Sequence, residues 1–253
     1  MVTLGEAALL GSAGFIAGGI NAVAGGGSLI SFPALLAVGY PSITANVTNT
    51  VAVWPGTIGG SLAYRRELEG QRDRIVLLGI TSVVGSLIGS VLLLASPARL
   101  FDQIVPFLIL FACALLAVQE RLALWVLRRQ GDDATGERSA GVIGAQLLAS
   151  IYGAYFTAGL GILILAFLGI FLRDNLQRLN ALKGLLSVVI NGVSALYFAL
   201  FGPVVWPVAA LMAVASWTGG YLGVRVARRL SPSRLRAVVL IYGVGVALWL
   251  LVT

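Results

Sequence analysis

The chain has 253 residues, of which 58% are hydrophobic and only 11% are charged. Soluble globular domains usually carry about 25% charged residues, so this chain has too few polar side chains to cover a water-facing surface. It contains no histidine and one cysteine, which excludes disulfide scaffolds and His/Cys metal sites. We therefore expect an all-α polytopic integral membrane protein without a cofactor, and the lack of a nucleophile–base pair argues against an enzyme.

Hydrophobic segments follow one another along the whole chain, at 3–22, 28–39, 43–64, 74–95, 100–126, 140–158, 160–172, 178–200, 204–227 and 235–252. Two of them, 28–39 and 160–172, would be helices under about 20 Å long, too short to cross a bilayer core of roughly 30 Å. Each follows a glycine cluster, and short half-helices after glycine breaks are typical of transporters built from discontinuous helices. We expect about eight transmembrane segments. Six spans with two re-entrant hairpins, or ten short spans, remain open.

The two halves of the sequence match when 134 is added to a first-half number. This offset pairs Gly25 with Gly159, Gly27 with Gly161, Asn46 with Asn180, Gly85 with Gly219 and Gly89 with Gly223. The last two pairs form Gly-x-x-x-Gly motifs, which favour close helix contacts. One residue of slippage later, the pattern S-P-x-R-L occurs at 96–100 and again at 231–235. We predict a first transmembrane repeat at 1–127, a polar cytoplasmic linker at 128–138 and a second transmembrane repeat at 139–253.

Arginine is concentrated in four regions, at 65–74, 121–138, 173–178 and 225–236, whereas the loops at 40–43, 96–99 and 201–204 hold only Arg99. Arginine in short loops sets the orientation of a membrane protein, so the charge of +7 does not indicate nucleic-acid binding. If the arginine-rich loops face the cytoplasm, both termini lie outside. The repeats are then inverted, which is the arrangement expected of alternating-access transporters. The predicted location is the cell membrane, in bacteria the inner membrane.

The first glycine cluster is a candidate anion-binding loop. Glycine lets backbone N–H groups approach a ligand, and the half-helix that begins near Ser28 points its positive end at the break. The candidate residues here are Gly25, Gly26, Gly27 and Ser28, with Gly159 and Gly161 as a second copy. Asn21 and Thr157 precede the two breaks, where their side chains would satisfy freed backbone groups or contact the ligand. The alternative for the glycines is close helix packing.

Lys183 is the only lysine of the chain and lies inside an apolar segment, which makes it a functional candidate. Asn180, Lys183, Ser187 and Asn191 share one helix face, and the matching face of the first half carries Asn46, Asn49, Val53 and Thr57. Two such polar faces would enclose a small hydrophilic cavity with one positive charge, which suits an anion. The alternative is that Lys183 extends to the interface and the amides bond neighbouring helices.

The run at 19–30 (G-I-N-A-V-A-G-G-G-S-L-I), Pro33, the run at 45–49 (A-N-V-T-N) and the second-half run at 180–184 (N-A-L-K-G) resemble the sulfite exporter TauE/SafE family. This resemblance implies transport of sulfite or small organosulfonates such as sulfoacetate, usually outward. The expected partners are the small anion and the lipid bilayer, and a homodimer is left open. The alternative function is a passive anion channel or a uniporter of another small organic anion.

Overall fold

The computed structural model describes residues 3–23, 26–62, 64–128, 139–172, 174–227 and 232–252, and these ranges contain helices and no strand. The helices are α1 (Leu4–Val23), α2 (Ser28–Ala37), α3 (Ser42–Leu62), η1 (Arg65–Leu68, a 3₁₀ turn), α4 (Arg72–Ala95), α5 (Ala98–Arg128), α6 (Ser139–Tyr155), α7 (Leu160–Phe171), α8 (Leu176–Phe201), α9 (Trp206–Ala227) and α10 (Pro232–Val252). The all-α class is confirmed, and every predicted hydrophobic segment coincides with a helix.

One order of helices occurs twice along the chain. Each half begins with a helix, continues with a short helix (α2 or α7) and ends with three longer ones. The helices α3, α4 and α5 begin at residues 42, 72 and 98, and α8, α9 and α10 begin 134 residues later in each case. The spacing of these helix starts is the offset that aligns the two halves of the sequence.

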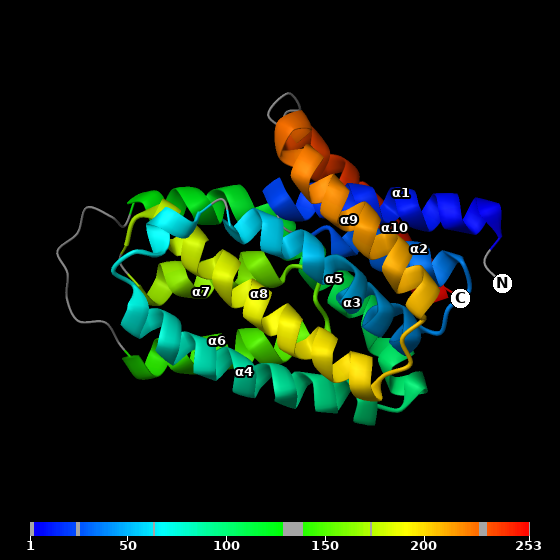
Figure 1. The fold of residues 1–253 in the computed structure, drawn as a ribbon, viewed down its shortest axis with the longest axis horizontal. Coiled ribbons are helices and arrows are strands. Elements are labelled where there is room, and N and C mark those ends of the chain that lie inside the picture. Colours follow the sequence, from blue (N-terminus) through cyan, green and yellow to red (C-terminus); the bar gives the residue numbers. More distant parts are fainter. Residues whose placement is uncertain are drawn as a thin grey trace.

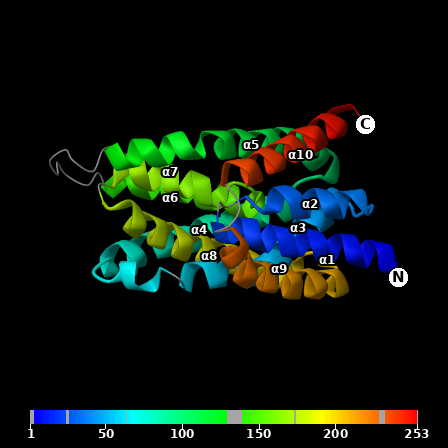
Figure 2. The same ribbon diagram turned by 90° about the horizontal axis from the view of Figure 1, so that it is seen from above.

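Most of the helices lie roughly along one long axis of the molecule, and α9 and α10 cross this axis obliquely in the view of Figure 1. Both termini lie at one end of this axis, which we call the terminal end (Figures 1 and 2). The turn η1, the end of α5 and the start of α6 lie at the opposite end, which we call the linker end. The short helix α2 returns toward the terminal end, where α1 begins, and α7 returns toward the linker end, where α6 begins. Each short helix is therefore the second arm of a hairpin that turns back inside the bundle.

The fourth helix of each half packs against helices of the other half. The helix α4 packs against α6 and α8, and α9 packs against α1 and α3. Glycines permit these contacts: a Cβ at Gly85 or Gly89 would collide with the backbone of α6, and one at Gly219 would collide with the backbone of α1. Gly18 of α1 meets the backbone of Ser216 in the same way. The Gly-x-x-x-Gly interpretation is thus confirmed for Gly85, Gly89 and Gly219, and the surroundings of Gly223 are outside what the structure describes.

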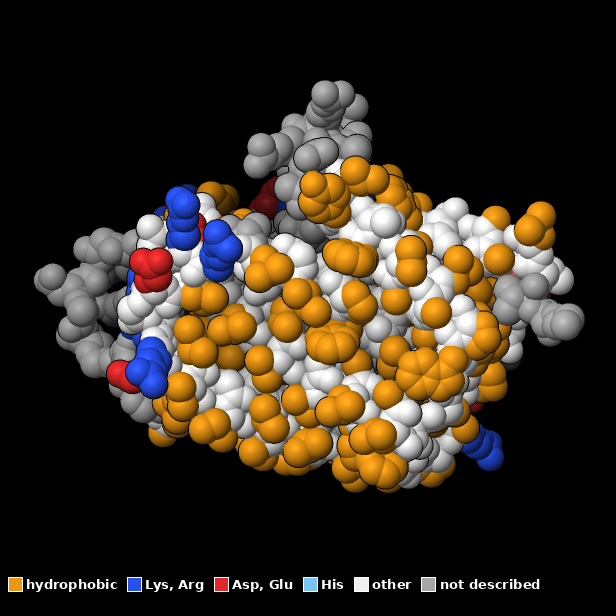
Figure 3. Space-filling model, in the orientation of Figure 1, with side chains coloured by type: hydrophobic (Ala, Val, Ile, Leu, Met, Phe, Trp, Pro, Cys, Tyr) orange, Lys and Arg blue, Asp and Glu red, His pale blue; other side chains and the backbone are white. Residues whose placement is uncertain are grey.

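The outward surface of the bundle is apolar between its two ends. On α4 the exposed large side chains are Val76, Leu77, Ile80, Val83, Val84, Leu87, Ile88, Val91 and Leu92. In the view of Figure 3, charged side chains gather mainly at the linker end, and the rest of this face is largely hydrophobic. Among the described residues, α4, α5 and α8 are long and apolar enough to cross a membrane, judged by length and composition. A surface of this kind is suited to lipid.

Candidate functional site

Each hairpin turns at a glycine in the left-handed conformation. Gly26 has φ +89° between α1 and α2, and Gly159 has φ +78° between α6 and α7. A residue with a Cβ rarely adopts this conformation, so glycine is needed for the turn at both positions. The offset of 134 pairs Gly159 with Gly25. By backbone conformation, however, Gly159 corresponds to Gly26, the residue after Gly25. Gly25 lies outside the described residues.

The two breaks satisfy their freed backbone groups with different side chains. In the first, the Asn21 carbonyl oxygen accepts a hydrogen bond from the Gly27 N–H at 2.7 Å, the capping role predicted for Asn21. In the second, the Tyr152 hydroxyl donates to the Ala158 carbonyl at 2.7 Å. Backbone groups in an apolar environment are costly when unpaired, so these bonds stabilise the interrupted helices.

Both breaks open onto one cavity of about 100 Å³ between α3 and α8. Its volume gives space for several water molecules or one small oxyanion. The residues that line it are Asn21, Gly26, Ser28, Val53, Gly56, Thr57, Ser61, Tyr64, Thr157, Leu160, Gly161, Asn180, Lys183, Gly184, Ser187 and Asn191. Because the first turns of α2 and α7 both belong to this wall, two positive helix ends meet at the cavity.

Among the described residues, Lys183 is the one charged side chain in this lining, and the other polar groups are amides, hydroxyls and backbone. Its ammonium donates a hydrogen bond to the Asn180 side-chain oxygen at 3.1 Å. No ion pair with an acid is found for it among the described residues. Holding such a charge inside an apolar helix bundle costs roughly 2.5–3.5 kcal/mol, and a cavity that admits water or an anion lowers this cost.

Most of the predicted binding residues line this cavity. They are Asn21, Gly26, Ser28, Thr57, Thr157, Gly161, Asn180, Lys183, Ser187 and Asn191. Four predicted residues do not line it, namely Gly27, Asn46, Asn49 and Gly159. Gly27 is the N-cap of α2 and Gly159 that of α7.

Asn46 and Asn49 are buried in contacts between helices. The Asn46 amide donates to the Tyr155 carbonyl at 2.8 Å, and the Asn49 carbonyl oxygen accepts from the Ser31 hydroxyl. One turn further along α3, the hydroxyls of Thr50 and Thr157 are 3.1 Å apart. The first half of α3 therefore binds to the second break rather than lining the cavity.

The cavity also includes residues that the sequence reasoning missed, namely Gly56, Ser61, Tyr64, Leu160 and Gly184. Ser61 follows Thr57 on α3 at a spacing of four residues, which places both on one side of the helix, and Tyr64 lies in the turn after α3, seven residues after Thr57. Extending the predicted polar face by two turns would have found them. Gly184 follows Lys183 directly, and its small size is the only property in the sequence that would have suggested a place in the cavity wall.

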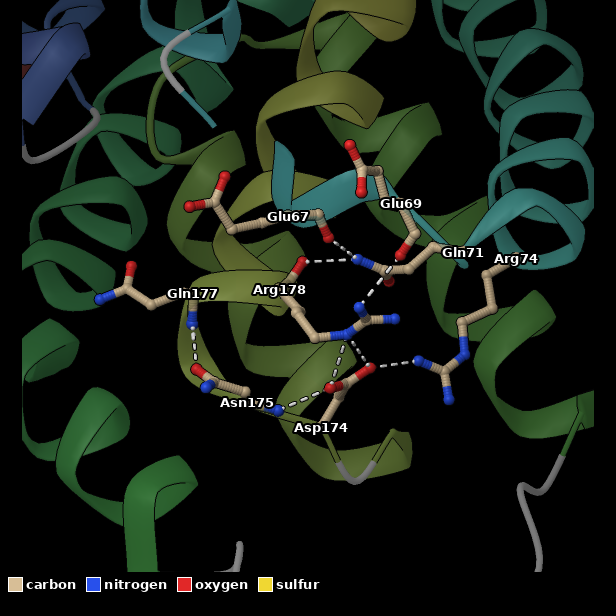
Figure 4. Close-up of polar contacts among 8 residues, drawn as sticks. All are labelled: Glu67, Glu69, Gln71, Arg74, Asp174, Asn175, Gln177 and Arg178. Carbon is tan, nitrogen blue, oxygen red and sulfur yellow. Dashed lines mark hydrogen bonds and ion pairs between the residues drawn. The ribbon is translucent and has the colours of Figure 1, made fainter. Parts of the chain in front are cut away.

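A polar cluster fixes the linker end (Figure 4). The Asp174 carboxylate pairs with Arg74 of α4 at 2.6 Å and with Arg178 of α8 at 3.0 Å. The Gln71 amide donates to the carbonyls of Glu67 and Arg178, and the Arg178 guanidinium donates to the Glu69 carbonyl. These bonds attach the start of α4 to the start of α8.

The charge state of Asp174 follows from this cluster. Burial raises the pKa of its carboxyl, but hydrogen bonds from Arg178, the Asn175 N–H and Arg74 outweigh that effect and hold the pKa below its ordinary value. The carboxylate is therefore ionised at neutral pH. Within the described part of the chain, no cluster of three or more Cys, Asp or Glu residues could hold a metal ion.

A polar cavity bounded by two interrupted helices inside an apolar helical bundle is the construction of a membrane transport protein. Residues 10–250 match the family model described as Sulfite exporter TauE/SafE, and the chain belongs to this family. It is similar to a probable membrane transporter protein of Haemophilus influenzae, with 28% identity over 237 residues that cover 92% of this chain and 90% of the relative.

Two further relatives carry similar names. The probable membrane transporter protein YfcA of Escherichia coli is 28% identical over 231 residues, which cover 89% of this chain and 82% of the relative. A probable membrane transporter protein of a Sinorhizobium species is 26% identical over 247 residues, which cover 96% of this chain and 92% of the relative. No solved structure matches. The chain is a membrane transporter.

Proposed function

We propose that this protein is a secondary transporter, working as an exporter, of small sulfur-containing anions such as sulfite or organosulfonates. The observation that carries the proposal is the cavity, because the described residues of its wall include one cation, Lys183, and no acid. Hydroxyls, amides and two helix N-termini supply further hydrogen bonds for oxyanion oxygens. Its volume of about 100 Å³ suits a small anion.

The mechanism we propose is alternating access between two inverted repeats, 1–127 and 139–253. Its support is the repeated order of helices and the reciprocal packing, in which α4 contacts α6 and α8 while α9 contacts α1 and α3. The hairpins α1–α2 and α6–α7 enter from opposite ends of the bundle (Figure 1). Inverted repeats of this kind place one site between two bodies that can tilt against each other.

Flux into vesicles reconstituted with the purified protein tests the function. The panel should contain sulfite, thiosulfate, sulfate, sulfoacetate and an uncharged sulfur compound of similar size, each with and without a pH gradient. We expect saturable flux and counter-exchange of at least one sulfur oxyanion or sulfonate, and none of the uncharged compound. Non-saturating flux without counter-exchange would instead identify a passive anion channel, and no anion flux at all would refute the proposal.

Orientation can be tested independently of substrate. We expect both termini outside and the 128–138 linker in the cytoplasm, because arginine predominates in the loops on the linker side. Cysteines introduced as Ser139→Cys and Thr253→Cys, in a Cys113→Ser background, should react with an impermeant thiol reagent from opposite sides of the membrane. Labelling of both from the same side would contradict the inverted repeats.

A further inference from the structure

The cavity reaches one end of the α3–α8 pair and is closed at the other. Ser61 and Tyr64, near the linker end of α3, line it, and Tyr64 is 37% exposed. Their counterparts 134 residues later, Ala195 and Phe198, are 3% and 0% exposed near the terminal end of α8. Equivalent positions thus have opposite environments, and the structure is open toward the linker end.

The first halves of the same two helices show the reverse arrangement. Asn180 lines the cavity, whereas its counterpart Asn46 is 2% exposed. The Asn46 amide holds the carbonyl of Tyr155, the last residue of α6, at 2.8 Å. Carbonyls in the last turn of a helix have no partner within it, so this bond satisfies a group that the hairpin leaves free. It also joins α3 of the first half to the hairpin of the second half.

Asn180 faces the corresponding hairpin without holding it. Its side-chain oxygen accepts from Lys183, and no partner for the two N–H donors of the amide is found among the described residues. Asn21, in the last turn of α1, lines the same cavity. The structure therefore contains two equivalent asparagines, one bonded across the bundle and one facing open space.

We propose that Asn46 and Asn180 are alternating gate residues, a step that rests on the inverted repeats of the proposed function. In the conformation described here, Asn46 closes the terminal end. In the opposite conformation the Asn180 amide donates to a carbonyl in the last turn of α1 and closes the linker end, while Asn46 leaves Tyr155 and lines the cavity. Each asparagine thus stabilises one of the two conformations.

The two gates differ in strength. Beside Asn46, Thr50 contacts Thr157 at 3.1 Å, and Phe32 packs edge-on against Phe156 with ring centroids 5.5 Å apart. The counterpart of Thr50 on α8 is Gly184, which has no hydroxyl to contribute. Closing the terminal end therefore gains more interactions than closing the linker end, which favours the conformation described here.

Thiol labelling tests the gates without any substrate. Matched reporters are Ser61→Cys and Ala195→Cys, each in a Cys113→Ser background, reacted with a charged thiol reagent on purified protein. We expect the reporter at 61 to react quickly and the one at 195 slowly. Adding Asn46→Ala should speed the reaction at 195 about fivefold or more, the population shift expected for one lost hydrogen bond.

The double variant separates a gate exchange from simple loosening. Asn46→Ala with Asn180→Ala should bring labelling at 195 back toward the parent rate, because the opposite conformation then loses its own stabilising bond. Labelling at 195 that is unchanged by Asn46→Ala, or faster still in the double variant, would overturn the proposal. If Asn46→Ala does not fold, Asn46→Ser replaces it, since a serine is too short to reach Tyr155. Thr81→Ala is the matched control, because Thr81 is half-buried on α4 and its hydroxyl donates to the Leu77 carbonyl of the same helix.

Anion flux through the same variants distinguishes this proposal from the proposed function. Saturable anion flux that depends on Lys183, together with labelling that ignores Asn46 and Asn180, would refute the gates and leave the function intact. The expected labelling exchange without flux of any anion would refute the substrate class and leave the gates intact.

Discussion

The two hairpin breaks have the same backbone conformation at their glycines but differ in the side chains that stabilise them. Gly26 and Gly159 both turn in the left-handed conformation. The second break is held from outside, because Asn46 and Thr50 of α3 bond to residues beside it. In the first, Asn21 bonds back to its own break. Both breaks open onto the cavity, and the comparison teaches that the second is in addition anchored by α3 of the opposite half, whereas the first is capped by a residue of its own hairpin.

The largest effect should come from a side chain at either turn. Gly26→Leu should abolish transport, because the leucine blocks the approach of backbone N–H groups to the ligand and strains the positive φ. Folded protein should persist, since a Cβ there would meet nothing nearer than 3.8 Å. Flux assays and the yield of monodisperse protein measure the two effects, and normal flux would show that the first break is not a binding loop.

Gly159→Leu is the matched variant for the anchored break. A Cβ there would lie 3.3 Å from the backbone of Ala112, tighter than at Gly26. We expect loss of folded protein as well as of flux, measured as a lower thermal unfolding midpoint than that of Gly26→Leu. Equal midpoints for the two variants would contradict the difference between the breaks.

The next largest effect concerns the charge of Lys183 in the cavity that both breaks reach. Lys183→Met should keep or improve stability but raise the half-saturation concentration for anions at least tenfold, about 1.4 kcal/mol. Lys183→Arg should restore charge without the full rate, because a planar guanidinium replaces a compact ammonium. Concentration-dependent flux in vesicles measures both. Unchanged anion transport by Lys183→Met would mean that the cavity does not use this charge.

The smallest effect is expected at the linker end, away from both breaks. Asp174→Asn should lower stability by roughly 1 kcal/mol or less, because the ion pairs are partly exposed. Since the pKa of Asp174 is held below its ordinary value, its contribution is present above about pH 4 and is lost as pH falls through the folded-state pKa.

Thermal unfolding in detergent, followed by tryptophan fluorescence across this pH range, measures the difference. The parent and Asp174→Asn should differ at neutral pH and converge in acid. Glu69→Gln is the control, since Arg178 uses the carbonyl of residue 69 and not its side chain. A difference that persists unchanged at the lowest pH would contradict the role of the carboxylate.

Hydropathy and glycine spacing predict the helices and the two breaks well, because both depend on local chain properties. The cavity face of α8 was predictable for the same reason: Asn180, Lys183 and Asn191 recur at helical spacing in an apolar segment. The left-handed turn at Gly26 was not predictable, since three consecutive glycines are equally able to adopt it.

Asn46 shows why the rest of the site could not be predicted. Periodicity places it on the polar face of α3, as it places Asn180 on that of α8. Which of the two asparagines lines the cavity depends on the conformation of the whole bundle. Because the two positions are equivalent in sequence, the sequence does not indicate which conformation the bundle adopts. Ser61 and Tyr64 were missed for a different reason, because the predicted polar face of the first half ended at Thr57, one turn before Ser61.

The packing of α4 against the second half and of α9 against the first half has a consequence for the synthesis of this chain. Gly18 of α1 packs on Ser216 of α9, a partner that leaves the ribosome about 200 residues later, or roughly 10–40 s at ordinary rates of synthesis. The glycine face of α4 likewise awaits α6 and α8. The helices inserted first must therefore be held in the bilayer by their own hydrophobicity. The first half cannot complete its packing before most of the second half has been translated.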